Sequence, residues 1–288
     1  MDVLLTKKPV EIIHPDNWTS PLVFSSPHSG SYYPETFVDQ SALDLLSLRQ
    51  SEDFLVDELF GAAPMLGAPL IKSNYPRAFC DPNRPPYELD PTMFIESLPN
   101  HVTISSTRIS AGLGTIPKVV SAGKNIYSHP LTYQEVQQRL ELCYFPYHAA
   151  LQSLLQEGIR KFGKILLIDC HSMPTATNNS GATSTLADFI LGDRFGNACP
   201  TEYSTRAAHI LKSFGYSVSY NSPYAGGFIT EHYSSTYKGV SALQIEINRK
   251  LYMEQSTLSA TDKMPILRDQ LAKFIEDISA VVSLKKTS

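Results

Sequence analysis

Two apolar, strand-like runs of this chain each lead to a histidine that is followed by a serine. The first run covers residues 22–25 and leads to His28, and the second covers residues 165–169 and leads to His171. Short buried strands that stop at a polar residue deliver its side chain to the carboxyl edge of a sheet, where open α/β folds bind their ligands. Because neutral imidazole is the commonest metal ligand in proteins, the repetition predicts a metal site at this edge. One such histidine alone is more often an ordinary, partly buried polar residue.

The order of the other elements also indicates an α/β fold. A chain of 288 residues permits one large domain or two small ones. We expect a single domain over residues 1–288, because no linker or change in composition marks a boundary. Residues 74–100 are rich in proline and aromatic side chains, and irregular segments of this kind in compact domains are commonly functional. The other expected strands cover residues 69–73, 102–104, 217–220 and 241–247, and the expected helices cover 41–61, 132–163, 201–214 and 262–284.

Composition argues against several functional classes. The net charge of −4 does not suit a protein that binds nucleic acid through general attraction to phosphates. No run approaches the roughly 18 apolar residues of a membrane span, and the first residues lack the apolar core of a secretory signal, so we expect a cytoplasmic protein. The four cysteines are scattered, without a Cys-x-x-Cys pair, so neither a disulfide framework nor a structural zinc knuckle is expected. Nothing in the sequence sets the oligomeric state.

A catalytic zinc site needs three protein ligands, and the best source of the third is the acidic stretch over residues 51–60. Most of its carboxylates fit the polar face of an amphipathic helix. Asp53 stands at the start of the apolar pattern and is placed to point inward, and Glu52 is its main competitor. Neighbouring side chains of a strand point to opposite faces, so Cys170 is expected to face the core if His171 faces the site.

Two further stretches carry residues that suit catalysis. An arginine fork matches a carboxylate in two parallel hydrogen bonds, so Asn83 and Arg84 fit the recognition of an acid. The Asp-Pro-Asn sequence at this point is equally good turn chemistry without any ligand. Glu246 interrupts an apolar strand and shares one face with Gln244 and Asn248. It fits either a general base beside a metal-activated water or a polar strand face exposed to solvent.

Taken in chain order, these blocks resemble the N-formylglutamate amidohydrolase family, which is related to zinc carboxypeptidases and aspartoacylases. Each block alone is short, but their collinear succession over nearly the whole chain is specific. The resemblance implies one N-formylglutamate amidohydrolase-like catalytic domain with three α/β/α layers and a mixed central sheet, the phosphorylase/hydrolase-like arrangement of zinc carboxypeptidases. The blocks are residues 26–30, the region of Asp53, and residues 77–85, 112–117, 144–148, 169–174, 226–230 and 244–249.

The resemblance implies a mononuclear zinc site whose ligands are His28, Asp53 and His171. Relatives of the family take the first two ligands from a His-x-x-Glu spacing. Here the third residue after His28 is Ser31, so the acid comes from elsewhere and Glu52 stays the alternative to Asp53. Another divalent transition metal would accept the same nitrogen and oxygen donors.

The resemblance also implies roles in catalysis and substrate binding. Glu246 is the catalytic acid/base, and Arg77 holds the developing oxyanion or a carboxylate. Asn83 and Arg84 hold the α-carboxylate of the substrate, and Arg249 is a further substrate-binding residue. The second substrate carboxylate needs another cation, for which the candidates are Arg108, Lys118, Lys124 and Arg249.

The implied reaction is the zinc-dependent hydrolysis of N-formyl-L-glutamate to formate and L-glutamate, a step of histidine degradation. The implied partner is therefore a small, acidic N-acyl amino acid. One alternative is a deacylase or carboxypeptidase-like hydrolase of another N-acyl amino acid, and another is a metal-bearing binding protein without turnover. The presence of Glu246 favours an enzyme, because a protein that only binds its ligand needs no acid/base.

Overall fold

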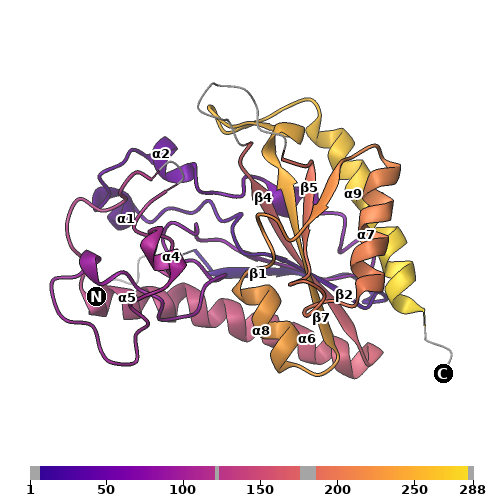
Figure 1. Ribbon diagram of the computed structural model, residues 1–288, viewed down its shortest axis with the longest axis horizontal. Coiled ribbons are helices and arrows are strands. Elements are labelled where there is room, and N and C mark those ends of the chain that lie inside the picture. Colours follow the sequence, from indigo (N-terminus) through magenta and orange to yellow (C-terminus); the bar gives the residue numbers. More distant parts are fainter. Residues whose placement is uncertain (1–6, 121–122, 176–185, 285–288) are drawn as a thin grey trace. The chain divides into compact units, whose positions relative to one another are not determined.

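The computed structural model describes residues 7–120, 123–175 and 186–284. Its strands are β1 Val10–Ile13, β2 Leu22–Ser26, β3 Leu70–Ser73, β4 Ile165–Met173, β5 Phe189–Gly192, β6 Val218–Tyr220, β7 Val240–Asn248, β8 Met253–Glu254 and β9 Ser259–Ala260. The first seven form one sheet in the order β1-β3-β2-β4-β7-β5-β6, and β8 pairs with β9 separately. β4 is parallel to β2 and to β7, whereas β5 is antiparallel to β7 and parallel to β6 (Figure 1). The predicted α/β fold with a mixed central sheet is confirmed.

The helices lie between these strands and after the last of them. No helix among the described residues is both long enough and apolar enough to cross a bilayer. Two short 3₁₀ segments cover Pro91–Met93 and Arg249–Leu251, and a π-helical segment covers Leu140–Tyr144. The α-helices are α1 Glu35–Asp39, α2 Leu45–Arg49, α3 Val56–Leu59, α4 Thr107–Ser110, α5 Tyr133–Arg139, α6 Phe145–Phe162, α7 Thr201–Ser213, α8 Phe228–Thr236 and α9 Met264–Ser283.

Packing divides the chain into two compact units. The single domain that the sequence suggests stays a prediction. The first unit consists of Met1–Glu11, Pro27–Glu52 and Lys72–Ala150, and the second consists of Ile12–Ser26, Asp53–Ile71 and Leu151–Ser288.

In the second unit, the apolar core lies between the sheet and the helices α3, α7 and α9. Figure 1 shows α7 and α9 on the same side of the sheet. Leu166, Ile168 and Cys170 of β4 belong to this core. Successive side chains of a strand point to opposite faces, so Asp169 and His171 lie on the other face of the sheet. α8 packs on β4 and β7, and its buried side chains are not part of that core. The expectation that Cys170 faces the core is confirmed.

In the first unit, the proline-rich segment packs through aromatic side chains. The buried guanidinium of Arg139 lies 4.6 Å from the ring centroid of Phe79 and 5.3 Å from those of Phe37 and Tyr127. Its Nη1 also donates a hydrogen bond of 2.6 Å to the hydroxyl of Tyr127. Because cation–π contacts are strongest where the cation is desolvated, Arg139 stabilises a segment that has little regular structure of its own.

The helix expected over residues 132–163 is present with one irregularity. It begins at a capping box made by Thr132 and Glu135, and its π-helical turn stands between α5 and α6. Pro146 follows this turn and has no N–H to donate to the carbonyl of Leu142, with which its ring would also clash in a regular α-helix. A wider turn before the proline relieves this conflict.

Two other expectations are wrong. The helix expected over residues 41–61 is split into α2 and α3, because Leu55 adopts a φ of 56° in the left-handed region, where a helix cannot continue. The strand expected over residues 102–104 is absent from the described structure, where Thr103 makes only an isolated bridge with Glu88. The first error matters for function, because the break leaves Glu52 and Asp53 in a turn before α3.

Candidate metal centre

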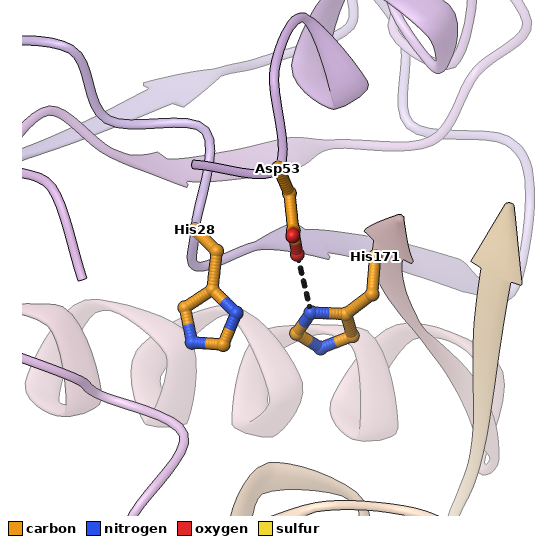
Figure 2. A group of neighbouring side chains, drawn as sticks. All are labelled: His28, Asp53 and His171. Carbon is orange, nitrogen blue, oxygen red and sulfur yellow. Dashed lines mark hydrogen bonds and ion pairs between the residues drawn. The ribbon is translucent and has the colours of Figure 1, made fainter. Parts of the chain in front are cut away.

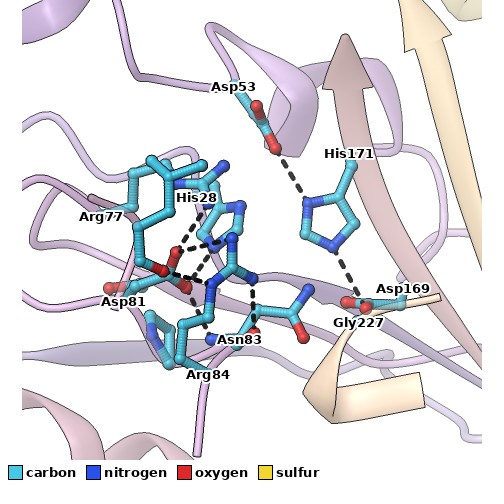
Figure 3. Close-up of polar contacts among 12 residues, drawn as sticks. His28, Asp53, Arg77, Asp81, Asn83, Arg84, Asp169, His171 and Gly227 are labelled. Carbon is cyan, nitrogen blue, oxygen red and sulfur yellow. Dashed lines mark hydrogen bonds and ion pairs between the residues drawn. The ribbon is translucent and has the colours of Figure 1, made fainter. Parts of the chain in front are cut away.

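His171 is held by carboxylates at both ring nitrogens. Its Nε2 lies 3.1 Å from Oδ2 of Asp169 on the same strand face, and its Nδ1 lies 2.9 Å from Oδ2 of Asp53 (Figure 3). Burial by itself would lower the pKa of His171, but Asp169, Asp53 and Glu246 together raise it well above its ordinary value. This concentration of negative charge around a buried imidazole suits the binding of a cation.

Asp53 lies in the turn before α3 and is 2% exposed. While Oδ2 contacts His171, Oδ1 lies 3.3 Å from Nη2 of Arg249. Arg249 begins the 3₁₀ turn after β7, and its Nε also donates to Oγ of Ser172 at 3.2 Å. Each carboxylate oxygen of Asp53 is therefore held by a neighbour, Oδ2 by His171 and Oδ1 by Arg249.

His28 follows the end of β2 by two residues and is buried. Its Nε2 lies 2.7 Å from Oδ1 of Asp81 (Figure 3). Asp81 also pairs with Nη2 of Arg77 at 2.7 Å, and Nη2 of Arg84 lies 3.9 Å away. Burial alone would raise the pKa of Asp81, but Arg77, His28 and Arg84 outweigh it and hold that pKa well below its usual range. An ionised carboxylate therefore faces Nε2 of His28.

One donor atom from each of His28, Asp53 and His171 lies within 4.8 Å of the others, and all three residues are buried (Figure 2). Two imidazoles and one carboxylate are the donor set of several catalytic zinc sites. Each histidine also presents Nε2 to a carboxylate, Asp81 or Asp169, which is how metal-binding histidines are commonly oriented. The residues therefore fit a divalent metal held through the two Nδ1 atoms and Asp53, and they form a candidate metal site.

Glu52, the alternative third ligand, has a different partner. Its carboxylate pairs with Arg49, with Nε to Oε1 at 2.9 Å and Nη2 to Oε2 at 3.2 Å. It is not part of the group of donors around the candidate metal site. The structure therefore favours Asp53 over Glu52, and the assignment of Asp53 as a ligand stays a prediction.

Asn83 and Arg84 lie in a turn that Asp81 organises. The backbone N–H of Asn83 donates to Oδ1 of Asp81 at 2.8 Å, and Nε of Arg84 donates to the carbonyl of Leu113 at 2.9 Å. Burial, the largest cause, lowers the pKa of Arg84, and the neighbouring guanidinium groups of Arg77 and Arg108 lower it further. The turn and the acid-recognition interpretations are therefore compatible, because the same turn places the guanidinium groups of Arg77 and Arg84 near Asp81.

Glu246 lies on the central strand β7 directly beside His171, its partner in the parallel pairing of β4 and β7. It is 7% exposed, so the interpretation as a solvent-facing strand residue is wrong. Nε2 of Gln244 donates to its Oε1 at 2.9 Å. A buried carboxylate next to a candidate metal ligand is suitably placed for acid/base work.

Sequence reasoning missed two residues that orient the histidines, Asp81 and Asp169. Asp169 stands two residues before His171 on one strand, so the two-residue period of a strand could have found it. Asp81 is 53 residues away from His28 along the chain, and no local pattern joins them. His148 of α6 places its Nε2 2.9 Å from the carbonyl oxygen of Pro82, next to the turn that carries Asn83 and Arg84.

Comparisons with known proteins show the family of this chain. A family model for N-formylglutamate amidohydrolase matches residues 20–253. The chain belongs to this family. It is 28% identical to N-formylglutamate deformylase of Pseudomonas putida over 239 residues, which is 82% of this chain and 83% of the relative. The same enzyme of Pseudomonas aeruginosa is 26% identical over 238 residues, with equal coverage.

A solved structure gives the same result for the fold. The crystal structure of N-formylglutamate amidohydrolase from Ralstonia eutropha JMP134 has a TM-score of 0.88 to this chain at 34% identity, and it covers 96% of this chain and 99% of its own. A gene product of Agrobacterium tumefaciens, at 16% identity and a TM-score of 0.68, shares the fold. The family that the sequence blocks resemble is therefore confirmed, and with it an N-formylglutamate amidohydrolase fold around a candidate metal site.

Proposed function

We propose that this N-formylglutamate amidohydrolase family member hydrolyses the amide bond of N-formyl-L-glutamate to formate and L-glutamate, a reaction of histidine degradation. The buried group of His28, Asp53 and His171, with Glu246 beside His171 on the next strand, carries the proposal. The names of the Pseudomonas and Ralstonia relatives support the substrate. A small, acidic N-acyl amino acid is then the partner, and a cytoplasmic location stays a prediction.

The proposed cofactor is Zn²⁺, held by His28, Asp53 and His171, and another divalent transition metal suits the same donors. When bound, such a metal polarises the acyl oxygen and lowers the pKa of a nearby water. Asp81 and Asp169 contact Nε2 of the two histidines and so keep each ring in the orientation in which Nδ1 would bind the metal. Arg249 keeps Asp53 turned toward His171.

Glu246 moves the proton in the proposed reaction. Its carboxylate accepts a proton from the attacking water as the new C–O bond forms. It then gives this proton to the amide nitrogen as the C–N bond breaks, so one water is consumed and formate and the free amine of glutamate are released. Arg77 is proposed to stabilise the oxyanion or to hold a carboxylate of the substrate, because its side chain is 21% exposed beside Asp81.

We propose that Asn83 and Arg84 bind the α-carboxylate, with Arg249 as a further substrate contact. For the second carboxylate we propose Arg108 over Lys118. Nζ of Lys118 is already 3.2 Å from Oδ2 of Asp90 and donates to Thr92 at 2.8 Å. Nη1 of Arg108 is 3.9 Å from the carboxylate of Glu88, beyond hydrogen-bonding distance.

The same region carries an excess of positive charge. Arg77, Arg84 and Arg108 supply three guanidinium groups, and Asp81 and Glu88 supply two carboxylates, which leaves one positive charge. The cluster therefore favours an acidic substrate over a neutral one.

The test is a substrate panel on zinc-loaded protein, with N-formyl and N-acetyl derivatives of glutamate, aspartate and neutral amino acids and with formate or acetate as the measured product. We expect N-formyl-L-glutamate to have the highest kcat/KM. No formate release from it across neutral pH would reject this substrate, and faster turnover of another N-acyl amino acid would establish the deacylase alternative.

Glu246→Gln should lower kcat by about 10²- to 10⁴-fold while zinc content stays equimolar. Wild-type activity in that variant would reject the proposed acid/base.

A further inference from the structure

Gln244 has an amide whose orientation is fixed by its neighbours. Its Oε1 accepts a hydrogen bond of 2.7 Å from the backbone N–H of Gly227, and a backbone N–H can only donate. The other end of the amide, Nε2, therefore points at Oε1 of Glu246, to which it donates at 2.9 Å. Gln244 is 4% exposed, so solvent does not compete strongly for these bonds.

The backbone that fixes this amide is itself held tightly. A Cβ atom on Gly192 would lie 2.8 Å from the carbonyl carbon of Ala225 and equally close to the nitrogen of Gly226, so the segment before Gly227 lies directly against β5. Gly227 is the residue before α8, and in the first turn of that helix Oγ1 of Thr230 donates to Asp169 at 3.3 Å. The N-terminal end of α8 thus supports both β4 and β7.

Two neighbouring strands repeat one arrangement. On β4, Asp169 stands two residues before His171 and contacts its Nε2, and on β7, Gln244 stands two residues before Glu246 and contacts its Oε1. The pairing of β4 with β7 places Asp169 beside Gln244 and His171 beside Glu246. His171 and Glu246 are therefore each contacted by the side chain two residues earlier on the same strand face.

We propose that Gln244 is a positioning residue for Glu246, and that the bond from Nε2 fixes the rotamer of this carboxylate. The inference rests on the proposed role of Glu246 in the reaction. Gln244 contributes no atom to the reacting groups and acts only through Glu246.

The test compares two substitutions that separate the two bonds of the amide. Gln244→Met removes both bonds at nearly constant volume. Gln244→Glu keeps an acceptor for the N–H of Gly227 but replaces the donor to Glu246 with a second carboxylate. The matched control is Gln40→Met, because Nε2 of Gln40 donates to Oε1 of Glu135 over the same 2.9 Å at an exposed site.

On zinc-loaded proteins, we expect both Gln244 variants to lower kcat for N-formyl-L-glutamate by about 10- to 100-fold, which is the effect of losing one hydrogen bond to a charged group. KM and zinc content should change less than twofold, and Gln40→Met should match the wild type. In a Glu246→Gln background, Gln244→Met should cost no further activity, because its effect passes through Glu246. A kcat within twofold of wild type in Gln244→Met overturns the inference. So does a rise in KM or a loss of zinc that is as large as the fall in kcat.

Crystal structures of the wild type and of Gln244→Met make the inference testable apart from turnover. We expect the carboxylate of Glu246 to leave its wild-type rotamer in the variant, and an unchanged carboxylate overturns the positioning role. If the wild type releases no formate, the proposed function fails, and the crystal structures still decide whether Gln244 positions Glu246.

Discussion

At the scale of single residues, the sequence predicts the candidate metal donors better than the residues that orient them. The apolar runs predict both histidines, because His28 follows the buried strand β2 and His171 lies near the end of the buried strand β4. Asp53 is predicted only with help from the family, since a row of acids on an amphipathic helix has the same composition as a binding site. Asp81 is beyond sequence reasoning, because its contact with His28 exists only in the folded chain.

The contacts at Nε2 predict the effect of removing the orienting carboxylates. Asp81→Asn and Asp169→Asn should each weaken zinc binding by about 10- to 100-fold, because an amide holds the imidazole less strongly than a carboxylate does. A competition titration with a chelating dye measures this affinity. Asp90→Asn is the control, since that carboxylate pairs with Lys118 instead of a histidine. Zinc affinities equal to wild type in both variants would contradict the orientation argument.

The arginine cluster predicts which cation selects the second carboxylate. Arg108→Gln should raise KM for N-formyl-L-glutamate by about tenfold, because one charge-assisted hydrogen bond is lost, and it should leave KM for N-formyl-L-glutamine unchanged. Lys118→Gln is the matched control, because its side chain is 34% exposed against 33% for Arg108 but is already engaged by Asp90. Steady-state kinetics on both substrates decide the matter, and equal effects of the two substitutions would reject Arg108.

At the scale of elements, the strands that carry His171 and Glu246 follow from apolar runs, whereas the turns that carry Asp53 and His28 do not. The helix expected over residues 41–61 breaks at Leu55, where a leucine adopts a left-handed backbone that its propensity opposes. Tertiary packing decides such a break, and a single sequence contains no sign of it. β1 and β5, of four residues each, are missing from the strands expected from the sequence.

The turn that carries His28 can be tested by a substitution at Gly30. A Cβ atom on Gly30 would lie 2.1 Å from the carbonyl oxygen of Tyr75, so Gly30→Ala must displace the turn. We expect a loss of stability of about 1–3 kcal/mol and weaker zinc binding, measured by urea unfolding and by zinc titration. Gly163→Ala is the control, since its φ of 75° makes alanine cost roughly 1–2 kcal/mol while nothing lies within 4 Å of the new atom. Unaltered zinc binding in Gly30→Ala would show that the turn does not set the position of His28.

At the scale of the whole molecule, the fold class follows from the sequence because alternating strands and helices leave few α/β arrangements, and the collinear blocks identify the family. The register of neighbouring strands, unlike the fold class, does not follow from the sequence. The pairing of β4 with β7 sets His171 beside Glu246, and a shift of one residue would turn one of them to the opposite face. Only the folded sheet fixes this pairing, so the closeness of the candidate metal donor His171 to Glu246, the proposed acid/base, is a property of the whole molecule and not of either strand.

The proposed metal ties stability to the candidate site, because its donors come from segments far apart in the chain. A ligand that binds only the folded protein stabilises it by RT ln(1 + [L]/Kd), which is about 2.7 kcal/mol when free zinc is 100 times Kd. Urea unfolding with zinc and with a chelator should differ by this amount in the wild type. The double variant His28→Ala, His171→Ala should show no such difference, because it lacks two of the three donors. The same zinc-dependent shift in that variant would place the metal at other residues and would contradict the candidate metal site.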